Sequence, residues 1–548
     1  MDTGLELVET MEAMRICAGR PNTNRFFKRV YCYLLALEYG GYYGARRLVK
    51  ACESPMDFAA QVVRNPRPLL LISRFTNVVL STLCIWICYK LAEIGRLGGS
   101  ASLGALGVAF CPAIVASAKV GSVDTTLVAT VLLSLFFMLR IVYRRPSAWN
   151  YLFVGAFLGL AFQVKPQGLM VVPGFLIAHI WAQAREGGWR KVAAIRPIFI
   201  VLGGFMLGFL LGNPVIVISP RAWLSDMLDL VKWYSGKMRL APIDQATSFP
   251  VYYFLTAWSQ LGPPLCILAV FGCLMGVKRR EPSLLIIAVG ALSFMLVMGC
   301  AKSQYLLSQH QALYSLALLC ILGGAGTCEI LGWIRGGRRL VWQTILVLCV
   351  LGFPACGATN IVLSYSGRST RKQAEIWIKA NIPPGSKVLM DSGSHINTFA
   401  PDIPESRQNI LDAMKGLEEE LAAQGRNVDR LGGKWDEHGL LHYRLRLQTL
   451  PDETYDITST KLGRDLQPIE HYRQHGFQYI VTCSYVKATI QGRDRREYPI
   501  SAGFYDALDS PDSPAHRLAT FEPDMFHNGP VFSVYALAPA KSKEAGNE

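Results

Sequence analysis

The sequence predicts a polytopic α-helical membrane protein of about ten spans, followed by a small C-terminal α/β domain in water. Of its 548 residues, 51% are hydrophobic and only 17% are charged. A soluble protein of this length needs more polar surface to cover its core. The apolar residues are concentrated in 68–364, whereas 365–548 has the composition of a soluble domain. One part of the chain is therefore expected in lipid and the other in water.

The apolar segments are long enough to be counted as individual spans. A helix needs about 20 apolar residues to cross the hydrocarbon, and somewhat fewer when it lies among other helices. The expected spans are 68–94, 99–117, 123–143, 150–164, 168–183, 195–218, 254–277, 283–301, 306–331 and 340–364.

The stretch 150–183 is predicted to be two short helices that meet at a polar turn. As one straight helix it would measure roughly 50 Å, against about 30 Å of hydrocarbon. Its middle reads Lys165-Pro166-Gln167-Gly168. Proline ends helices, and a lysine inside lipid is costly. A break at this position is therefore more favourable than a continuous span.

The charges of the loops support the break and give the direction of the spans. With the break, all the basic clusters between spans fall on one side of the membrane, which the positive-inside rule makes the cytoplasm. These clusters are Arg144–Arg145, Arg185–Arg196, Lys278–Arg280 and Arg335–Arg339. The turns at 119–124, 165–168, 219–253 and 302–305 then face outward, as does the domain 365–548.

The N-terminal segment 1–67 is also expected to face outward, since the number of spans is even. It contains ten Lys or Arg residues, and the unaided export of such a segment would be unusual. A first span preceding Met1 is therefore expected. The tyrosine-rich stretch from Tyr31 to Gly44 favours an interfacial helix on the outer leaflet, because tyrosine prefers the membrane interface.

Ionisable residues at the outward ends of the spans are the candidates for chemistry, because charges near lipid tend to be functional. Asp2 opens the N-terminal segment, Asp124 begins a span and Lys165 lies at the broken hairpin. A carboxylate can accept a proton from a hydroxyl group, and a lysine can neutralise a departing phosphate. The alternatives remain open at this point: Asp124 can cap its helix, Lys165 can extend to the interface, and Asp2 can be a solvated terminal residue.

The order and spacing of several motifs resemble bacterial membrane glycosyltransferases of the GT-C superfamily, in the branch related to protein O-mannosyltransferases and lipid A aminoarabinose transferases. The start at Asp2 resembles the family's acidic loop motif, with Thr3 where a second acid is usual. The turn from Ala116 to Asp124 resembles its second acidic site. Gly159 to Gly168 is similar to its Gly-Leu-Ala…Lys turn, and Gly212-Asn213-Pro214 to the end of the following span.

This resemblance implies a sugar donor carried on a polyprenyl phosphate and an acceptor that it does not identify. Asp2 would act as the base, Asp124 would orient the acceptor or a divalent cation, and Lys165 would hold the donor phosphate. The further substrate-binding candidates are Lys119, Lys302, Gln304 and Tyr305. It also implies a transmembrane glycosyltransferase-like domain at 68–364 and a location in the bacterial inner membrane.

Other classes of function are less well supported by the sequence. A net charge of +15 could suggest nucleic acid, but the basic residues lie in membrane loops and no nucleic-acid motif accompanies them. No dedicated protein metal site is predicted. A transporter or flippase of lipid-linked substrates would place charges near the membrane midplane and often shows internal repeats. The sequence shows no visible repeat, and its charges lie at one face of the membrane. A truncated, inactive glycosyltransferase paralogue is the remaining alternative.

Overall fold

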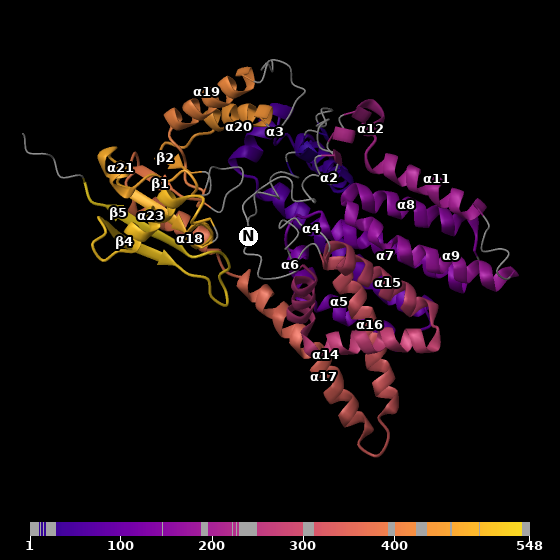
Figure 1. Ribbon diagram of the computed structural model, residues 1–548. Helices are drawn as coiled ribbons and strands as arrows, with labels where there is room; N and C mark the ends of the chain where they lie inside the picture. Colours follow the sequence, from indigo (N-terminus) through magenta and orange to yellow (C-terminus); the bar gives the residue numbers. More distant parts are fainter. Residues whose placement is uncertain are drawn as a thin grey trace, which may run out of the picture.

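The protein is described from a computed structural model, which is mostly helical and has one small sheet (Figure 1). The structure describes residues 10, 12–14, 16–17, 29–144, 146–187, 195–221, 223–225, 227–228, 249–299, 312–392, 400–423, 436–460, 463–492 and 494–539. In Figure 1 the sheet and its helices lie at one end of the molecule. The apolar helices lie at the other end, and α17 (Arg339–Ser364) leads from them toward the sheet.

Apolar helices or helix pairs coincide with each of the ten predicted spans. Among the described residues, seven helices are long and apolar enough to cross a membrane, and a bent pair makes an eighth candidate. Two shorter apolar helices, Ala148–Val164 and Pro282–Met298, account for the other two predicted spans. The seven are Arg67–Ile94, Asp124–Tyr143, Pro166–Arg185, Ile195–Gly212, Val251–Arg279, Leu313–Trp333 and Arg339–Ser364.

The remaining elements of the helical part are shorter or overlap these spans. Helices α2 (Arg29–Leu48) and α3 (Pro55–Arg64) precede α4 (Arg67–Ile94). The others are α5 (Ser100–Ala109), α6 (Pro112–Ala118), α7 (Asp124–Tyr143), α8 (Ala148–Val164), the 3-10 helix η1 (Pro166–Val171), α9 (Val172–Gly187), α11 (Ile195–Gly212), α12 (Val215–Ile218), α14 (Phe249–Arg279), α15 (Pro282–Gly299) and α16 (Leu313–Trp333).

The predicted break after residue 164 is confirmed. Helix α8 ends at Val164, Lys165 has an extended backbone (φ −156°, ψ 139°), and η1 begins at Pro166. The ring of a proline disfavours the helical conformation for the residue before it, which accounts for the extended lysine. A Cβ at Gly168 would lie 2.7 Å from the Cβ of Ala161, so this turn folds back closely on α8.

Two other predicted spans are not straight. The stretch 99–117 is divided into α5 and α6, which meet at an angle of 57°. Pro112 begins α6, and a proline cannot continue the hydrogen bonding of α5. Helix α14 is kinked at Gly262 (φ 78°), just before Pro263 and Pro264. Proline therefore shapes all three departures from a simple bundle.

Helices α8 and α11 lie unusually close together along glycine-lined faces. A Cβ at Gly155 of α8 would be 2.0 Å from the carbonyl oxygen of Val201, and one at Gly208 of α11 would be 1.9 Å from that of Ala156. Real side chains do not make such contacts, so glycine is required for this approach. Small residues spaced by four are the usual means of close helix packing in membranes.

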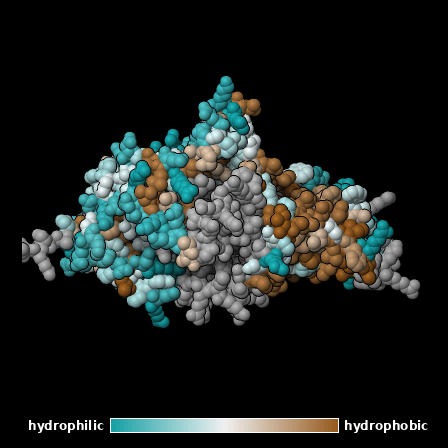
Figure 2. Space-filling view, turned by 90° about the horizontal axis from the view of Figure 1, so that it is seen from above, coloured by the Kyte–Doolittle hydropathy of each residue, from teal (hydrophilic) through white to brown (hydrophobic). Residues whose placement is uncertain are grey.

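The surface of the molecule divides as the composition predicted. Figure 2 shows a largely hydrophobic surface over the apolar helices and a largely hydrophilic one over the C-terminal α/β part. Exposed apolar side chains are numerous on the helices, for example Leu71, Phe199 and Leu296. In water such a surface would be unfavourable, whereas in lipid it is the expected exterior.

The C-terminal part is built around a five-stranded sheet with the order β2-β1-β3-β5-β4. The first three strands are parallel and the last two join antiparallel. The elements are α18 (Thr370–Asn381), β1 (Lys387–Met390), α19 (Arg407–Ala423), α20 (Asp436–Gln448), β2 (Asp456–Ser459), α21 (Ile469–Gln474), β3 (Tyr479–Cys483), α22 (Ser484–Gln491), α23 (Pro499–Asp509), β4 (Ala515–Phe521) and β5 (Phe532–Leu537). The small C-terminal α/β fold that the sequence predicted is confirmed.

A buried carboxylate joins the centre of this sheet to a covering helix. Asp391 follows β1 and is fully buried. It accepts a hydrogen bond from the amide of Cys483 at 3.0 Å and another from the hydroxyl of Tyr505 at 2.7 Å. Burial raises the pKa of Asp391 to about 7, although these two donors favour the charged form.

The stability of this part is therefore expected to fall as the pH rises. An unfolded aspartate loses its proton near about pH 4, whereas the folded one keeps it to about pH 7. Between these two pH values the folded state binds more protons than the unfolded state. The stabilisation that the protonated carboxyl group provides is complete below about pH 4 and is lost as the pH rises to about 7. The loss should reach a few kcal/mol, since each pH unit contributes about 1.4 kcal/mol.

Limited proteolysis during thermal unfolding of the full-length protein, at pH 5 and pH 8, measures this effect. The Asp391→Asn variant should show a smaller difference between the two pH values than the wild type. Exposed Asp402 provides the control, because Asp402→Asn should leave the difference unchanged. Equal differences in the wild type and in Asp391→Asn would contradict the prediction.

Candidate active site

The turn between α6 and α7 is held in place by a buried asparagine of α4. Asn77 is fully buried, and its Nδ2 donates to the backbone carbonyls of Val120 and Ser122, the latter at 2.8 Å. Carbonyls at such a turn have no helical partner, so an amide side chain from a neighbouring helix satisfies them. This buried amide fixes the position from which α7 begins.

Asp124 is the first residue of α7 and is 5% exposed. Its carboxylate accepts a hydrogen bond from the hydroxyl of Ser122 at 2.7 Å, and its own amide donates to the same hydroxyl at 3.2 Å. An acid at a helix N-terminus is also stabilised by the helix dipole. The alternative that Asp124 caps its helix is wrong, because Val123 is the N-cap residue and no side-chain capping bond is present. The hydrogen bond from Ser122 instead holds the carboxylate in one orientation.

Lys165 forms an ion pair with Asp124. The two side chains come from the start of α7 and the end of α8 and are only 13% and 7% exposed. A buried charge without a partner is strongly destabilising, so each residue makes the other tolerable at this depth. The structure therefore brings together the carboxylate and the cation that the sequence predicted on one face.

Helix α2 packs over the same turn. The hydroxyl of Tyr31 donates to the carbonyl of Ser73 at 3.2 Å, and that of Tyr39 to the carbonyl of Leu69 at 3.2 Å. A Cβ at Gly121 would lie 2.4 Å from the hydroxyl of Ser73, so the turn lies closely against α4. The predicted helix over 31–44 is confirmed, and its place on the outer leaflet stays a prediction.

Lys119 points to a different part of the molecule from the ion pair. Its ammonium group donates to the carbonyls of Ile361 and Val362 at 3.3 and 3.4 Å. It also lies 4.8 Å from the centroid of the Tyr365 ring. Lysine at the end of a helix can satisfy the last carbonyls, and here it connects the acidic turn to the end of α17. Its predicted contact with substrate stays a prediction.

The other predicted site residues are not placed by the structure. Asp2, Lys302, Gln304 and Tyr305 lie outside the described residues. Among the described residues no three His, Cys, Asp or Glu side chains gather as possible metal ligands. The described part of the candidate site is therefore the Asp124–Lys165 ion pair and the side chains that hold it in place.

A buried amide that the sequence analysis missed lies beside this pair in the chain. Gln163 of α8 is fully buried, and among the described residues neither end of its amide has a hydrogen-bond partner. A Cβ at Gly212 would be 3.0 Å from its side chain and 3.1 Å from that of Val30. A polar residue within an apolar span could have indicated it. Such an amide can donate to and accept from a hydroxyl group.

Comparison with known proteins identifies a family to which part of the chain is similar. Residues 71–217 match the family model described as dolichyl-phosphate-mannose-protein mannosyltransferase. The matched segment runs from α4 to α12 and contains Asn77, Asp124 and Lys165.

One curated relative is "Putative mannosyltransferase YycA" of Bacillus subtilis (strain 168). It is 28% identical over 162 residues, which are 28% of this chain and 23% of the relative. The similarity thus spans about a quarter of the relative's length.

Several solved membrane glycosyltransferases are also similar over most of the chain. The oligosaccharyltransferase of Archaeoglobus fulgidus, in complex with Zn and sulfate, has a TM-score of 0.47 and 10% identity, covering 91% of this chain and 67% of that one. ArnT from Cupriavidus metallidurans bound to undecaprenyl phosphate has a TM-score of 0.42 and 12% identity, covering 97% of each chain.

The apolar helices indicate a multi-pass membrane protein, and residues 71–217 resemble a mannosyltransferase family. The predicted resemblance to the protein O-mannosyltransferase branch is confirmed by the match over 71–217.

Proposed function

We propose that this chain transfers a sugar from a polyprenyl-phosphate-linked donor to an acceptor hydroxyl on the extracytoplasmic face of the membrane. The buried pair of Asp124 and Lys165 carries the proposal. It lies inside the segment that matches the mannosyltransferase family. A cation held at a membrane-facing turn is suited to a phosphate, because preorganised charge is most effective where water is excluded.

The reaction would use these groups in a single displacement. The acceptor oxygen bonds to the anomeric carbon while the bond from that carbon to the phosphate oxygen breaks. The proton of the acceptor hydroxyl goes to a carboxylate, for which Asp2 is proposed. The polyprenyl phosphate leaves with the bonding electrons, and Lys165 neutralises the charge that develops on it. Asp124 orients Lys165 and can also orient the acceptor.

The loop charges support the location of this reaction. They put the ends of the spans that carry Asp124 and Lys165 outside the cytoplasm. By the same rule the C-terminal α/β part is proposed to be extracytoplasmic. A location in the bacterial inner membrane is proposed from the family resemblance. The donor would enter from the bilayer, and the acceptor is not identified by these features.

A divalent cation remains an expectation of the family resemblance. In this turn the described residues offer Asp124 as an acidic ligand, and its carboxylate is already paired with Lys165. One paired carboxylate is a poor match for a hard cation that prefers several oxygen ligands. The proposed mechanism therefore routes no step through a metal.

Transfer of label from a radiolabelled polyprenyl-phosphate sugar, by the purified protein in vesicles with host-derived acceptors, tests the proposal. Label should leave the polyprenyl-phosphate donor and appear covalently in a different product. Movement of intact labelled lipid between leaflets would instead identify a flippase. Absence of both, with donor binding retained, would identify an inactive paralogue.

A further inference from the structure

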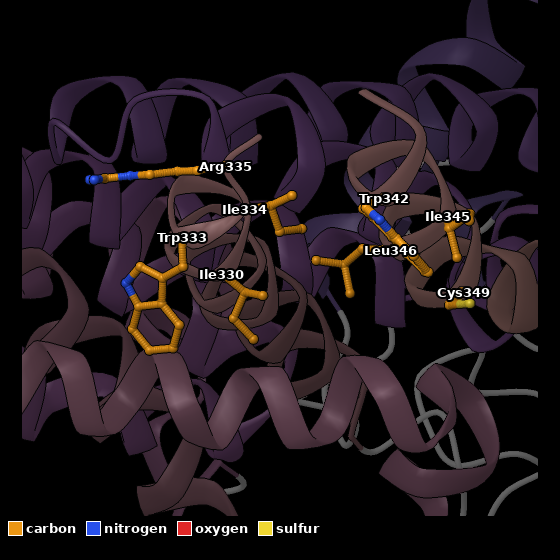
Figure 3. A pocket seen from close by; sticks show the side chains of 8 residues that line it. All are labelled: Ile330, Trp333, Ile334, Arg335, Trp342, Ile345, Leu346 and Cys349. Atoms are coloured by element: carbon orange, nitrogen blue, oxygen red, sulfur yellow. The ribbon is translucent and has the colours of Figure 1, made fainter. Parts of the chain in front are cut away.

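The hairpin formed by the end of α16 and the start of α17 carries an apolar cavity of about 530 Å³. Figure 3 shows side chains from both helices lining it, with Arg335 at its edge. The two helices are tied together at this level, since the amide of Gln343 donates to the carbonyl of Leu331 at 3.0 Å. The cavity lies near the start of α17, whereas Lys119 donates to carbonyls near the end of that helix.

The lining of the cavity suits a hydrocarbon chain. Ile330, Ile334, Ile345 and Leu346 form its walls. Trp333 and Trp342 also line it and are 60% and 56% exposed. Tryptophan is enriched where hydrocarbon meets the headgroups of a bilayer. The cavity therefore lies at the depth at which a lipid's acyl chain joins its polar part.

The turn beside the cavity is positively charged and lacks compensation. Arg335, Arg338 and Arg339 are exposed, and among the described residues none of them forms an ion pair. Glu329 is the only acid in 313–364, and it is bound to Arg279 through two hydrogen bonds. Basic clusters next to a span attract anionic lipids by about 1 kcal/mol for each residue.

We propose that this cavity binds an anionic glycerophospholipid of the leaflet that contacts the arginine-rich turn. One acyl chain would lie between α16 and α17, and the phosphate would contact Arg335. The uncompensated charge of the turn supports this occupant over a zwitterionic lipid. The site is separate from the Asp124–Lys165 pair, so it does not depend on the proposed sugar transfer.

Quenching of tryptophan fluorescence by brominated lipids tests this site in the full-length protein. The chain has 11 tryptophans, so the hairpin signal is the difference between the wild type and a Trp333→Phe/Trp342→Phe variant. In phosphatidylcholine vesicles with the same minor fraction of either lipid, brominated phosphatidylglycerol should quench that signal at least about twofold more than brominated phosphatidylcholine.

Charge variants separate the arginine turn from general lipid contact. Replacing all three arginines of the turn with glutamine should abolish the preference, and replacing them with lysine should retain it and show that the hairpin still folds. Exposed Arg96 at the end of α4 is the control, because Arg96→Gln should retain the preference. Equal quenching by both lipids in the wild type would overturn the proposal.

Other occupants give different results. Protection of the hairpin signal from both brominated lipids would show that another copy of the chain covers the cavity, and would overturn the proposal. Recovery of the fluorescence on adding a short polyprenyl phosphate, but not on adding unbrominated phosphatidylglycerol, would assign the cavity to the donor lipid instead.

Discussion

Replacing Lys165 with glutamine is expected to lower the rate of the proposed sugar transfer by about 10²–10³-fold, the usual loss when one preorganised group at a developing charge is removed. The same change leaves the buried carboxylate of Asp124 without its cation. We therefore expect a loss of roughly 3–5 kcal/mol in the free energy of unfolding, because removing one partner of a buried ion pair is costly. Initial rates of label transfer and thermal unfolding in detergent measure the two effects.

A double variant separates the chemical role of the pair from its structural role. Asp124→Asn combined with Lys165→Gln removes both charges, so most of the stability should return while transfer remains lost. Lys90→Gln is the matched control, because Lys90 forms an exposed pair with Glu93. Such pairs contribute little, so that variant should match the wild type. Wild-type transfer by Lys165→Gln would contradict the assignment.

Gly208→Ala in α11 is expected to destabilise the protein by roughly 3 kcal/mol or more, at the upper end of the effects of overpacking. The added Cβ would lie 1.9 Å from the carbonyl oxygen of Ala156 and 2.7 Å from its carbonyl carbon. Both atoms belong to the backbone of α8, so no side-chain rotation can relieve the clash. The helices must separate along the whole interface that Gly155 and Gly204 also form.

Gly203→Ala provides a stringent control for this prediction. Gly203 lies in the same helix, and a Cβ there would meet no atom within 4 Å. Alanine is also a better helix former than glycine, so this variant should be neutral or slightly stabilising. Thermal unfolding midpoints and the fraction of monodisperse protein in detergent compare the two. Equal midpoints for both variants would show that the α8–α11 contact is not close.

Local chemistry explains what the sequence could predict about the fold. The break at Lys165 and Pro166 was found because proline restricts the preceding residue and lysine is costly in lipid, and both effects act within a few residues. The bend between α5 and α6 follows from Pro112 in the same way, but the apolar character of both halves hid it. In the sheet, β2 and β4 are short or largely exposed strands and lack a clear apolar pattern.

In the candidate site, too, some residues could be predicted from local sequence and others could not. Asp124 and Lys165 were predicted individually, since each is a charged residue at the end of an apolar segment. Asn77 was not, because its purpose depends on carbonyls at Val120 and Ser122, more than forty residues away. Gln163 was missed because one amide within an apolar helix does not alter the pattern that predicts a span.

Lys119 illustrates most clearly what a sequence does not contain. Its partners at Ile361 and Val362 are more than 240 residues away, and nothing local indicates that α17 ends beside it. The sequence by itself determined the membrane-spanning class, the break and the charged residues at the span ends, because hydropathy, proline and charge act locally. Only the tertiary structure decided that Lys165 binds Asp124 and Lys119 binds α17, because those choices depend on which helices pack together.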